Sequence, residues 1–144
     1  MAFLHGKKAA FSIDNAAGTP VDISAYCDNV QMPRQIETAD TTGFGVSGNA
    51  KTYVVGLVDG TISISGSFDA NGASSVDAVL SGVLGQDASL TFLYKVSNAA
   101  VSATNPSWGG ECFMTSYEVS SPVADKVSFS AEFQITGPVT RTAA

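Results

Sequence analysis

The chain has 144 residues, of which 44% are hydrophobic and 14% are charged, and its formal net charge is −6. A chain of this length forms one ordinary domain, so we expect a single domain over residues 1–144. Globular proteins usually carry about one quarter charged residues, so a surface this poor in charge is typical of one that meets other protein. The seven basic residues are scattered along the sequence, which argues against tight nucleic-acid binding through a clustered basic face.

The metal-binding side chains are few and far apart. Cys27 and Cys112 are the only cysteines and His5 is the only histidine, without a C-x-x-C spacing, so we expect no zinc site and no cofactor. Two buried free thiols are the simpler expectation. The N-terminal run MAFLHGKKAA has no apolar core of signal-peptide length, and no apolar run approaches membrane-spanning length. These features favour folding in a reducing cytoplasm, away from membranes.

The first third of the chain is typical of short strands. Residues 8–13 and 21–26 are separated by a turn-forming segment, and residues 29–33 continue the sheet until Pro33 interrupts it. Residues 35–56 then lack an apolar period, so we expect a long loop between strands. A loop of this length without secondary structure is unusual in a compact domain and should have a function.

This segment contains GFGVSG (43–48), which fits the G-x-G-x-x-G spacing of a dinucleotide-binding turn. That turn needs a buried strand before it and a helix after it. Here the preceding QIETADTT is polar, and the following TYVV (52–55) is β-branched and aromatic, which favours a strand. A P-loop fails as well, because Asn49 and Ala50 separate Gly48 from Lys51. The glycines therefore predict a flexible loop and not a phosphate site.

The remainder of the chain combines strands with one helix. Residues 61–68 and 126–135 alternate apolar and polar side chains, and residues 89–96 and 111–120 supply two more strands. Between them, residues 74–84 carry an apolar stripe at helical spacing, with Ser74 as the expected N-cap and Gly85 at the C-terminal turn. The pattern predicts a mainly β protein, an antiparallel sandwich or barrel with one flanking helix.

No arrangement of side chains predicts catalysis. His5 lies close to the N-terminus, where a general base would be poorly held, and the thirteen acids are spread over strand ends and loops. The calcium-loop pattern D-x-D-x-D-G is absent. We therefore expect no enzyme. Trp108, in the turn-rich segment 98–110, is either a core plug or an exposed interface anchor.

The order of motifs between residues 21 and 69 resembles the major tail tube protein of long-tailed, siphovirus-type bacteriophages. The resemblance covers about a third of the chain, and its specificity lies in the succession of motifs, none of which is catalytic. The glycine-rich GVSGN (45–49) departs from the family pattern. The matching motifs are DIS (22–24) with Tyr26, PR (33–34), ETADTT (37–42) with FG (44–45), AKTYVVGL (50–57), DGTIS (59–63) and FD (68–69).

The resemblance implies a β-sandwich with one helix, six copies in a ring, and rings stacked into a hollow tube that carries DNA during ejection. It also implies kinship in fold with the tube protein of type VI secretion systems. Such a protein would be made in the bacterial cytoplasm and end in the virion tail. Its partners would be further copies of itself and the tape measure, terminator and distal tail proteins, with DNA only in transit.

Two sets of residues then become candidate surfaces. In the long loop we expect an inter-subunit arm, and its candidate residues are Thr38, Asp40, Thr42, Phe44, Gly45, Lys51 and Tyr53. The polar sides of the two alternating strands hold almost no Lys or Glu, which would suit a tube wall but also an ordinary Ser/Thr-rich sheet. The candidate residues facing the lumen are Ser63, Ser65, Ser67, Ser128, Ser130, Glu132 and Gln134.

The competing interpretation is a free-standing binding module, such as a sugar-binding or adhesive β-sandwich. Trp108 and Tyr117 would then form its binding platform. Such a module stays monomeric or forms a small oligomer, whereas a tube protein polymerises.

Overall fold

The computed structural model of the chain describes residues 5–45 and 47–143. These residues form eight strands and one α-helix, with short 3₁₀ turns between some of them. In chain order the elements are β1 (Ala10–Asp14), β2 (Pro20–Asp22), β3 (Cys27–Gln31), β4 (Arg34–Asp40), β5 (Tyr53–Ser67), α1 (Val76–Val83), β6 (Leu90–Lys95), β7 (Ser107–Ser120) and β8 (Ser128–Thr142).

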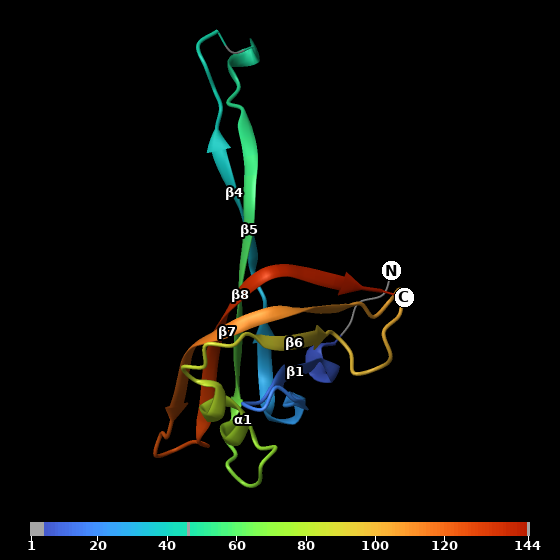
Figure 1. Cartoon of the computed structure of the whole chain (residues 1–144), viewed down its shortest axis with the longest axis vertical. Coiled ribbons are helices and arrows are strands. Elements are labelled where there is room, and N and C mark those ends of the chain that lie inside the picture. The colour runs from blue at the N-terminus through green and yellow to red at the C-terminus, as the bar shows by residue number, and fades with distance from the viewer. Residues whose placement is uncertain (1–4, 46, 144) are drawn as a thin grey trace.

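All eight strands belong to one antiparallel sheet. Seven of them follow the order β2-β1-β6-β7-β8-β5-β3, and β4 pairs with β5 beyond this path. The expectation of a mainly β, antiparallel protein with one helix is confirmed, but the sheet is not closed into a barrel. Figure 1 shows a body built from most of the strands and α1, and a long projection made of β4 and the first half of β5.

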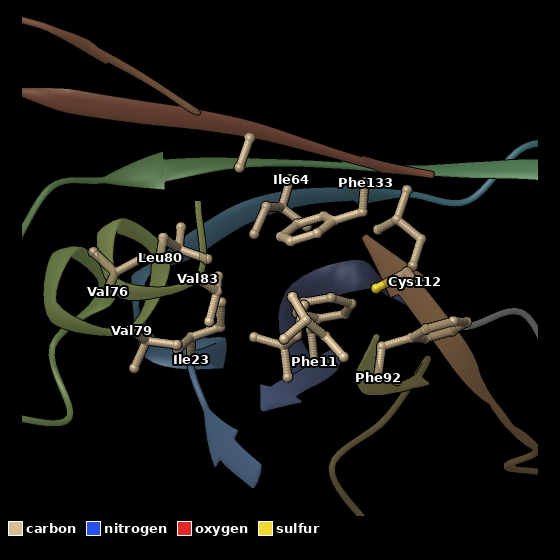
Figure 2. Packing of buried hydrophobic residues seen from close by; sticks show 14 of the residues in the cluster. Phe11, Ile23, Ile64, Val76, Val79, Leu80, Val83, Phe92, Cys112 and Phe133 are labelled. Carbon is tan, nitrogen blue, oxygen red and sulfur yellow. The ribbon is translucent and has the colours of Figure 1, made fainter. Parts of the chain in front are cut away.

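The core lies in the body, where side chains from β1, β5, β6, β7 and β8 meet and α1 adds its own from one side (Figure 2). The alternation in residues 61–68 and 126–135 is confirmed for Ile62 and Ile64 of β5 and for Phe129 and Phe133 of β8, which are at most 2% exposed. Val127, expected to face inward, is instead 39% exposed. Burying a side chain of this kind stabilises the fold by about 1.5–3 kcal/mol. The remaining core side chains are Phe11, Ile13, Ile23, Val76, Val79, Leu80, Val83, Leu90, Phe92, Cys112, Ala131 and Ile135.

Helix α1 covers part of this core. The side chain of Ser75 accepts a hydrogen bond from the Ala78 amide and caps the helix, one residue after the expected Ser74. Gly85 has φ +83°, which confirms the left-handed turn after the helix. Leu84, expected in the apolar stripe, is instead 52% exposed. The Tyr117 hydroxyl donates to Asp77 Oδ1 at 2.8 Å and ties the helix to β7.

The expectation of a loop over all of residues 35–56 is wrong, because both ends of this segment are strands. Residues 34–40 and 53–60 pair as an antiparallel hairpin, with register partners such as Ile36 opposite Val58 and Asp40 opposite Tyr53. The polar run QIETAD showed no strand pattern because neither face of β4 is buried, and every residue of the strand is exposed. Similarly, only residues 21 and 22 of the expected strand 21–26 belong to a strand, and Ser24–Tyr26 forms a 3₁₀ turn.

A close approach fixes β3 against β5 in the body. A Cβ at Gly66 would lie 1.9 Å from the Tyr26 carbonyl oxygen, so only glycine fits there. The register shifts between Cys27 and Asn29, and Asp28 is the extra residue of this β-bulge. The bulge places Asp28 beside Ser65, on the face of the sheet turned away from the core.

Candidate assembly surfaces

The first candidate surface is the hairpin of residues 34–60, which we call the arm. It extends from the body along the long axis of the molecule (Figure 1). Strand β5 supplies both regions, because its residues 61–67 pair with β8 in the body while residues 53–60 pair only with β4. The arm is therefore a two-stranded ribbon, a form that is at best marginally stable in water by itself.

The arm exposes apolar side chains on both of its faces. Ile36 and Val58 are opposite each other and are 50% and 64% exposed. Leu57 is 79% exposed and points to the other face, since successive side chains of a strand alternate. Soluble proteins rarely expose contiguous apolar surface unless it meets a partner. The other exposed apolar side chains of the arm are Phe44, Tyr53, Val54 and Val55.

Polar contacts close the far end of the hairpin. The Thr41 amide donates to the Thr52 carbonyl at 2.8 Å, and the Thr52 amide donates to Thr42 Oγ1 at 2.8 Å. Asp40 Oδ1 accepts from the Thr42 amide at 2.8 Å. Hydrogen bonds from the Thr42 side chain and backbone hold the pKa of Asp40 below its usual value, so this carboxylate stays charged at neutral pH.

The structure brings the seven expected loop residues together on the arm, but in two different settings. Thr38, Asp40 and Tyr53 lie in the paired strands, whereas the other four lie in the connection between the strands. Phe44, with a side chain as exposed as in an isolated residue, marks the tip. Sequence reasoning missed Ile36, Leu57 and Val58, although the density of β-branched residues between 53 and 58 was a usable signal.

The second candidate surface is the side of the body sheet opposite the core, which we call the polar face. Six of the seven expected lumen residues form its centre, because Ser63, Ser65 and Ser67 are the register partners of Glu132, Ser130 and Ser128. The neighbouring strands extend the same face with small or polar side chains. Those side chains are Asn29 and Gln31 of β3, and Ser116, Glu118 and Ser120 of β7.

Gln134, the seventh expected lumen residue, has a different environment. Its side-chain amide donates to Asp59 Oδ1 at 2.7 Å and to the Gly60 carbonyl at 2.9 Å. These contacts join β8 to the base of the arm where β5 leaves the body. Gln134 is two residues from Glu132 in β8, so it lies on the same side of the sheet, at the edge of the polar face nearest the arm.

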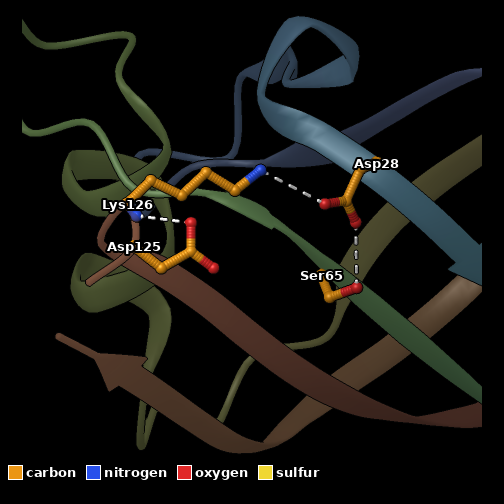
Figure 3. Close-up of polar contacts among 4 residues, drawn as sticks. All are labelled: Asp28, Ser65, Asp125 and Lys126. Atoms are coloured by element: carbon orange, nitrogen blue, oxygen red, sulfur yellow. Dashed lines mark hydrogen bonds and ion pairs between the residues drawn. The ribbon is translucent and has the colours of Figure 1, made fainter. Parts of the chain in front are cut away.

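A set of polar contacts crosses the polar face near one end (Figure 3). Lys126 Nζ lies 3.6 Å from Asp28 Oδ2, and Ser65 Oγ donates to Asp28 Oδ1 at 3.2 Å. The Lys126 amide also donates to Asp125 Oδ1 at 2.7 Å. Both charged groups of the ion pair are more than half exposed, so the pair contributes at most about 1 kcal/mol.

The polar face carries more acid than base. Asp28, Glu118 and Glu132 are exposed on it, and Lys126 is the base beside them. Two shallow hollows of about 260 and 240 Å³ lie along the face, and both are lined mainly by serines and these acids. A surface of this kind repels phosphate groups instead of binding them.

A groove lies at the base of the arm, and we call it the root groove. It forms because β5 and β8 pair only as far as Thr61 and Gln134 and then separate. Its volume is about 460 Å³. Its lining is mostly apolar, from Leu57, Val58, Ile135, Pro138 and Val139.

The side chains that could do chemistry are not arranged for it. His5 is exposed, and its Nδ1 only accepts from the Lys7 amide. Burial raises the pKa of both thiols to about 12, although Cys27 is only half-buried, so neither is a nucleophile at neutral pH. Within residues 5–45 and 47–143, no three His, Cys, Asp or Glu side chains are grouped as metal ligands would be. No helix of this part of the chain is long and apolar enough to cross a membrane.

The two aromatic residues considered for a binding platform are engaged elsewhere. Trp108 is half-buried in β7 and stacks on Tyr94, with ring centroids 5.9 Å apart. It is thus neither a fully buried plug nor a free anchor. Tyr117 is half-buried with its hydroxyl on Asp77.

Comparison with known proteins finds matches at the level of structure. No protein-family model and no curated protein matches the sequence. A chain in the tail of an empty gene transfer agent particle, refined helically with C6 symmetry, superimposes with a TM-score of 0.80 at 17% identity, over 98% of this chain and 100% of that one. The chain shares the fold of tail and tube proteins.

Two further matches have the same fold. The SPP1 tail tube matches with a TM-score of 0.67 at 15% identity, over 99% of this chain and 80% of that one. The sheath/tube terminator of the PVC extracellular contractile injection system matches with 0.70 at 13% identity, over 99% of both chains. The fold expected from the tail-tube resemblance is therefore confirmed along the whole chain and not only over residues 21–69.

Proposed function

We propose that this chain is the structural subunit of a phage-type tail tube. Six copies form a ring, and rings stack into a hollow tube through which DNA passes during ejection. The tail and tube folds found among solved structures support this function, and one of those assemblies was refined with six-fold symmetry.

The arm is the observation that carries the proposal. Its apolar side chains on two faces cannot be covered by the body of the same chain, from which it projects. Neighbouring copies can cover them, and burial of each large apolar side chain would contribute about 1.5–3 kcal/mol to the contact. In this proposal Thr38, Asp40, Thr42, Phe44, Gly45, Lys51 and Tyr53 contact another subunit, together with Ile36, Leu57 and Val58.

The polar face supplies the wall of the channel. The serines of β5 and β8 on this face provide a wall of small hydroxyl side chains. Asp28, Glu118 and Glu132 make the wall acidic. A ring of six copies would have a formal charge of about −36, six times that of one chain. Each phosphate neutralised by a basic group would strengthen DNA binding, so an acidic wall lets DNA move.

The proposed tube needs proteins at its two ends and in its channel. We propose that these are terminator, distal tail and tape-measure proteins of the same particle. The similarity to a chain of a sheath/tube terminator supports the first of them, because end proteins with this fold can continue the contacts of the tube.

Assembly of the purified protein tests the function. Sedimentation velocity and electron microscopy at rising protein concentration should show rings and then tubes with six-fold end views. A strictly monomeric profile at all concentrations and salt levels, with no rings or tubes, would contradict the proposal. It would favour the free-standing β-sandwich module.

A second candidate is the tube of a contractile injection system. The similarity to a chain in the structure of the PVC sheath/tube terminator favours it, because that injection system contains both a sheath and a tube. Such a tube would form the same rings and tubes. Co-purification of native tubes with a sheath protein, and without packaged DNA, would support this candidate over a DNA conduit.

A further inference from the structure

Strands β5 and β8 separate at one point of the sheet, which we call the fork. Its residues are Asp59 and Gly60 of β5 and Gln134 and Ile135 of β8. Figure 1 shows β5 continuing into the arm beyond this point while β8 turns away toward the C-terminus. The last ladder pair before the fork is Thr61 opposite Gln134. Continued pairing in the same register would place Gly60 opposite Ile135, so the ladder stops although both strands continue.

Side chains take the place of the missing ladder bonds at the fork. The side-chain nitrogen of Gln134 donates to the Gly60 carbonyl at 2.9 Å and lies 3.3 Å from the Ile135 carbonyl oxygen. The same nitrogen donates to Asp59 Oδ1 at 2.7 Å, and this oxygen also accepts from the Gly60 amide at 2.9 Å. Both backbone groups of the buried Gly60 therefore have partners without the backbone of β8.

The other side of the arm root is held by backbone bonds. The Thr61 amide donates to the Pro33 carbonyl at 3.1 Å, and Arg34 at the start of β4 is the register partner of Gly60. Among the described residues, the hydrogen bonds that join residues 53–60 to β8 come from the side chain of Gln134. The pairing with β4 thus keeps the two strands of the arm together, whereas Gln134 connects the arm to the body sheet.

A small change of angle at the fork moves the far end of the arm by a large amount. Strand β5 runs from Gly60 back to Tyr53, a distance of about 23 Å for an extended strand. A tilt of about 10° at the fork therefore displaces Tyr53 by about 4 Å. Apolar side chains are in contact only when their atoms approach within about 4.5 Å, so a displacement of this size breaks such a contact.

We propose that Gln134 is a positioning residue that holds the fork open and thereby sets the direction of the arm in the free subunit. Without its amide the carbonyls of Gly60 and Ile135 lose a donor, and the strands recover hydrogen bonds by pairing further. This pairing ends at Gly137, which has φ +79°, and at Pro138, which has no amide N–H. The arm then leans toward β8 and narrows the root groove.

Pulsed EPR measures the direction of the arm in dilute, monomeric protein. Spin labels are attached through Val55→Cys on the arm and Thr140→Cys on β8 beyond the fork, and both positions are exposed. Gln134→Leu removes the amide, so it should shorten the mean distance between the labels by about 4 Å and broaden its distribution about twofold. Cys27 and Cys112 should stay unlabelled, because their raised pKa keeps both thiols protonated.

An exchange of the hydrogen-bonding pair separates positioning from a general loss of stability. Gln134→Glu sets a carboxylate against Asp59 and should broaden the distribution as Gln134→Leu does. Adding Asp59→Asn restores a hydrogen bond between the two side chains, with donor and acceptor exchanged, and should narrow the distribution again. Gln31→Glu is the matched control, because it makes the same change at an exposed position of β3 away from the fork. It should leave the distribution unchanged.

Three results would overturn the inference. They are an unchanged distribution in Gln134→Leu, a distribution in the exchanged pair as broad as in Gln134→Glu alone, and equal broadening by Gln31→Glu. A lower midpoint of urea unfolding in Gln134→Leu together with the original distance distribution would also overturn it, because Gln134 would then only stabilise the fold. The inference concerns the single chain and its test does not use tube formation, so its failure and that of the proposed function are distinguishable.

Discussion

Strand β5 passes through two environments, and the difference between them separates folding from assembly. In the body, Ile62 and Ile64 are covered by the core and are at most 2% exposed. In the arm, Val58 lies on the same face of the same strand and is 64% exposed. The strand thus carries apolar side chains even in the arm, where no other part of the same chain packs over them. Apolar residues of the body stabilise the subunit, whereas in the proposed tube those of the arm are covered by neighbouring copies.

The largest expected effect is the loss of stability caused by a substitution in the core of the body. Phe133→Ala removes a fully buried ring from the core and should lower the free energy of unfolding by about 3–5 kcal/mol. Urea unfolding of the free subunit, followed by circular dichroism, measures the loss. An unchanged midpoint would contradict the assignment of Phe133 to the core.

The arm should respond in the opposite way. The double variant Leu57→Ser and Val58→Ser changes only exposed side chains, so the free energy of unfolding should stay within about 0.5 kcal/mol of the original. Tubes should nevertheless be lost in electron microscopy, because the apolar contact with neighbours is gone. Leu93→Ser on the body is the matched control and should assemble normally. Normal tubes from the arm variant would remove the distinction between the two regions.

The polar face gives a third, smaller effect, on DNA and not on assembly. Glu132→Lys adds +2 per chain and +12 in a ring of six, and tubes should still form because the side chain is exposed. DNA should now bind the tubes, with an affinity that falls with salt by a slope of about −0.9 for each phosphate contact. Asp87→Lys, an equal change in charge away from the polar face, should not retain DNA.

Two results would count against this picture of the channel. Tight, salt-sensitive DNA binding by the unaltered tubes would refute the DNA conduit. Equally weak DNA binding by the Glu132 and Asp87 variants would instead show that the polar face does not line the lumen.

Thiol labelling gives the smallest effect and sharpens the same contrast. Burial raises the pKa of Cys27 and Cys112 from 9.0 to about 12, so both should resist iodoacetamide at pH 8 in the folded subunit. A cysteine introduced on the arm by Val55→Cys should react at the rate of a free thiol. The pKa of each thiol is higher in the folded state than in the unfolded state. The stability that the protonated thiols contribute is therefore present below pH 9 and is lost as the pH rises from 9 toward 12. Rapid labelling of the native thiols at pH 8 would contradict this account.

The body was predictable from the sequence because one face of its strands is buried. The alternation around Ile62 and Phe133 identified both central strands and the inward side chains, and the spacing of Val76, Val79, Leu80 and Val83 identified the helix. The register between the strands and the openness of the sheet could not be predicted. They depend on bulges such as the one at Asp28 and on close approaches such as the one at Gly66.

The arm was predicted as a functional segment but not as a hairpin. Both its faces are exposed in the single chain, so no period of two appears in residues 35–40, and a bulge between Ile36 and Thr38 interrupts the pairing. In the proposed tube its contact residues are defined by a neighbouring chain, which a single sequence does not describe. The density of Tyr, Val and Leu between residues 53 and 58 was the one local sign of a contact surface.

Amide hydrogen exchange across residues 34–60 tests the central claim most directly, because it compares the arm and the body in free subunits and in assembled tubes. The account predicts rapid exchange in the arm of the free subunit, since a two-stranded ribbon without cover opens easily, and strong protection once tubes form. The body strands β5 to β8 should be protected in both states. Equal protection of the arm in free and assembled protein would contradict the claim that the arm is the element completed by neighbouring copies.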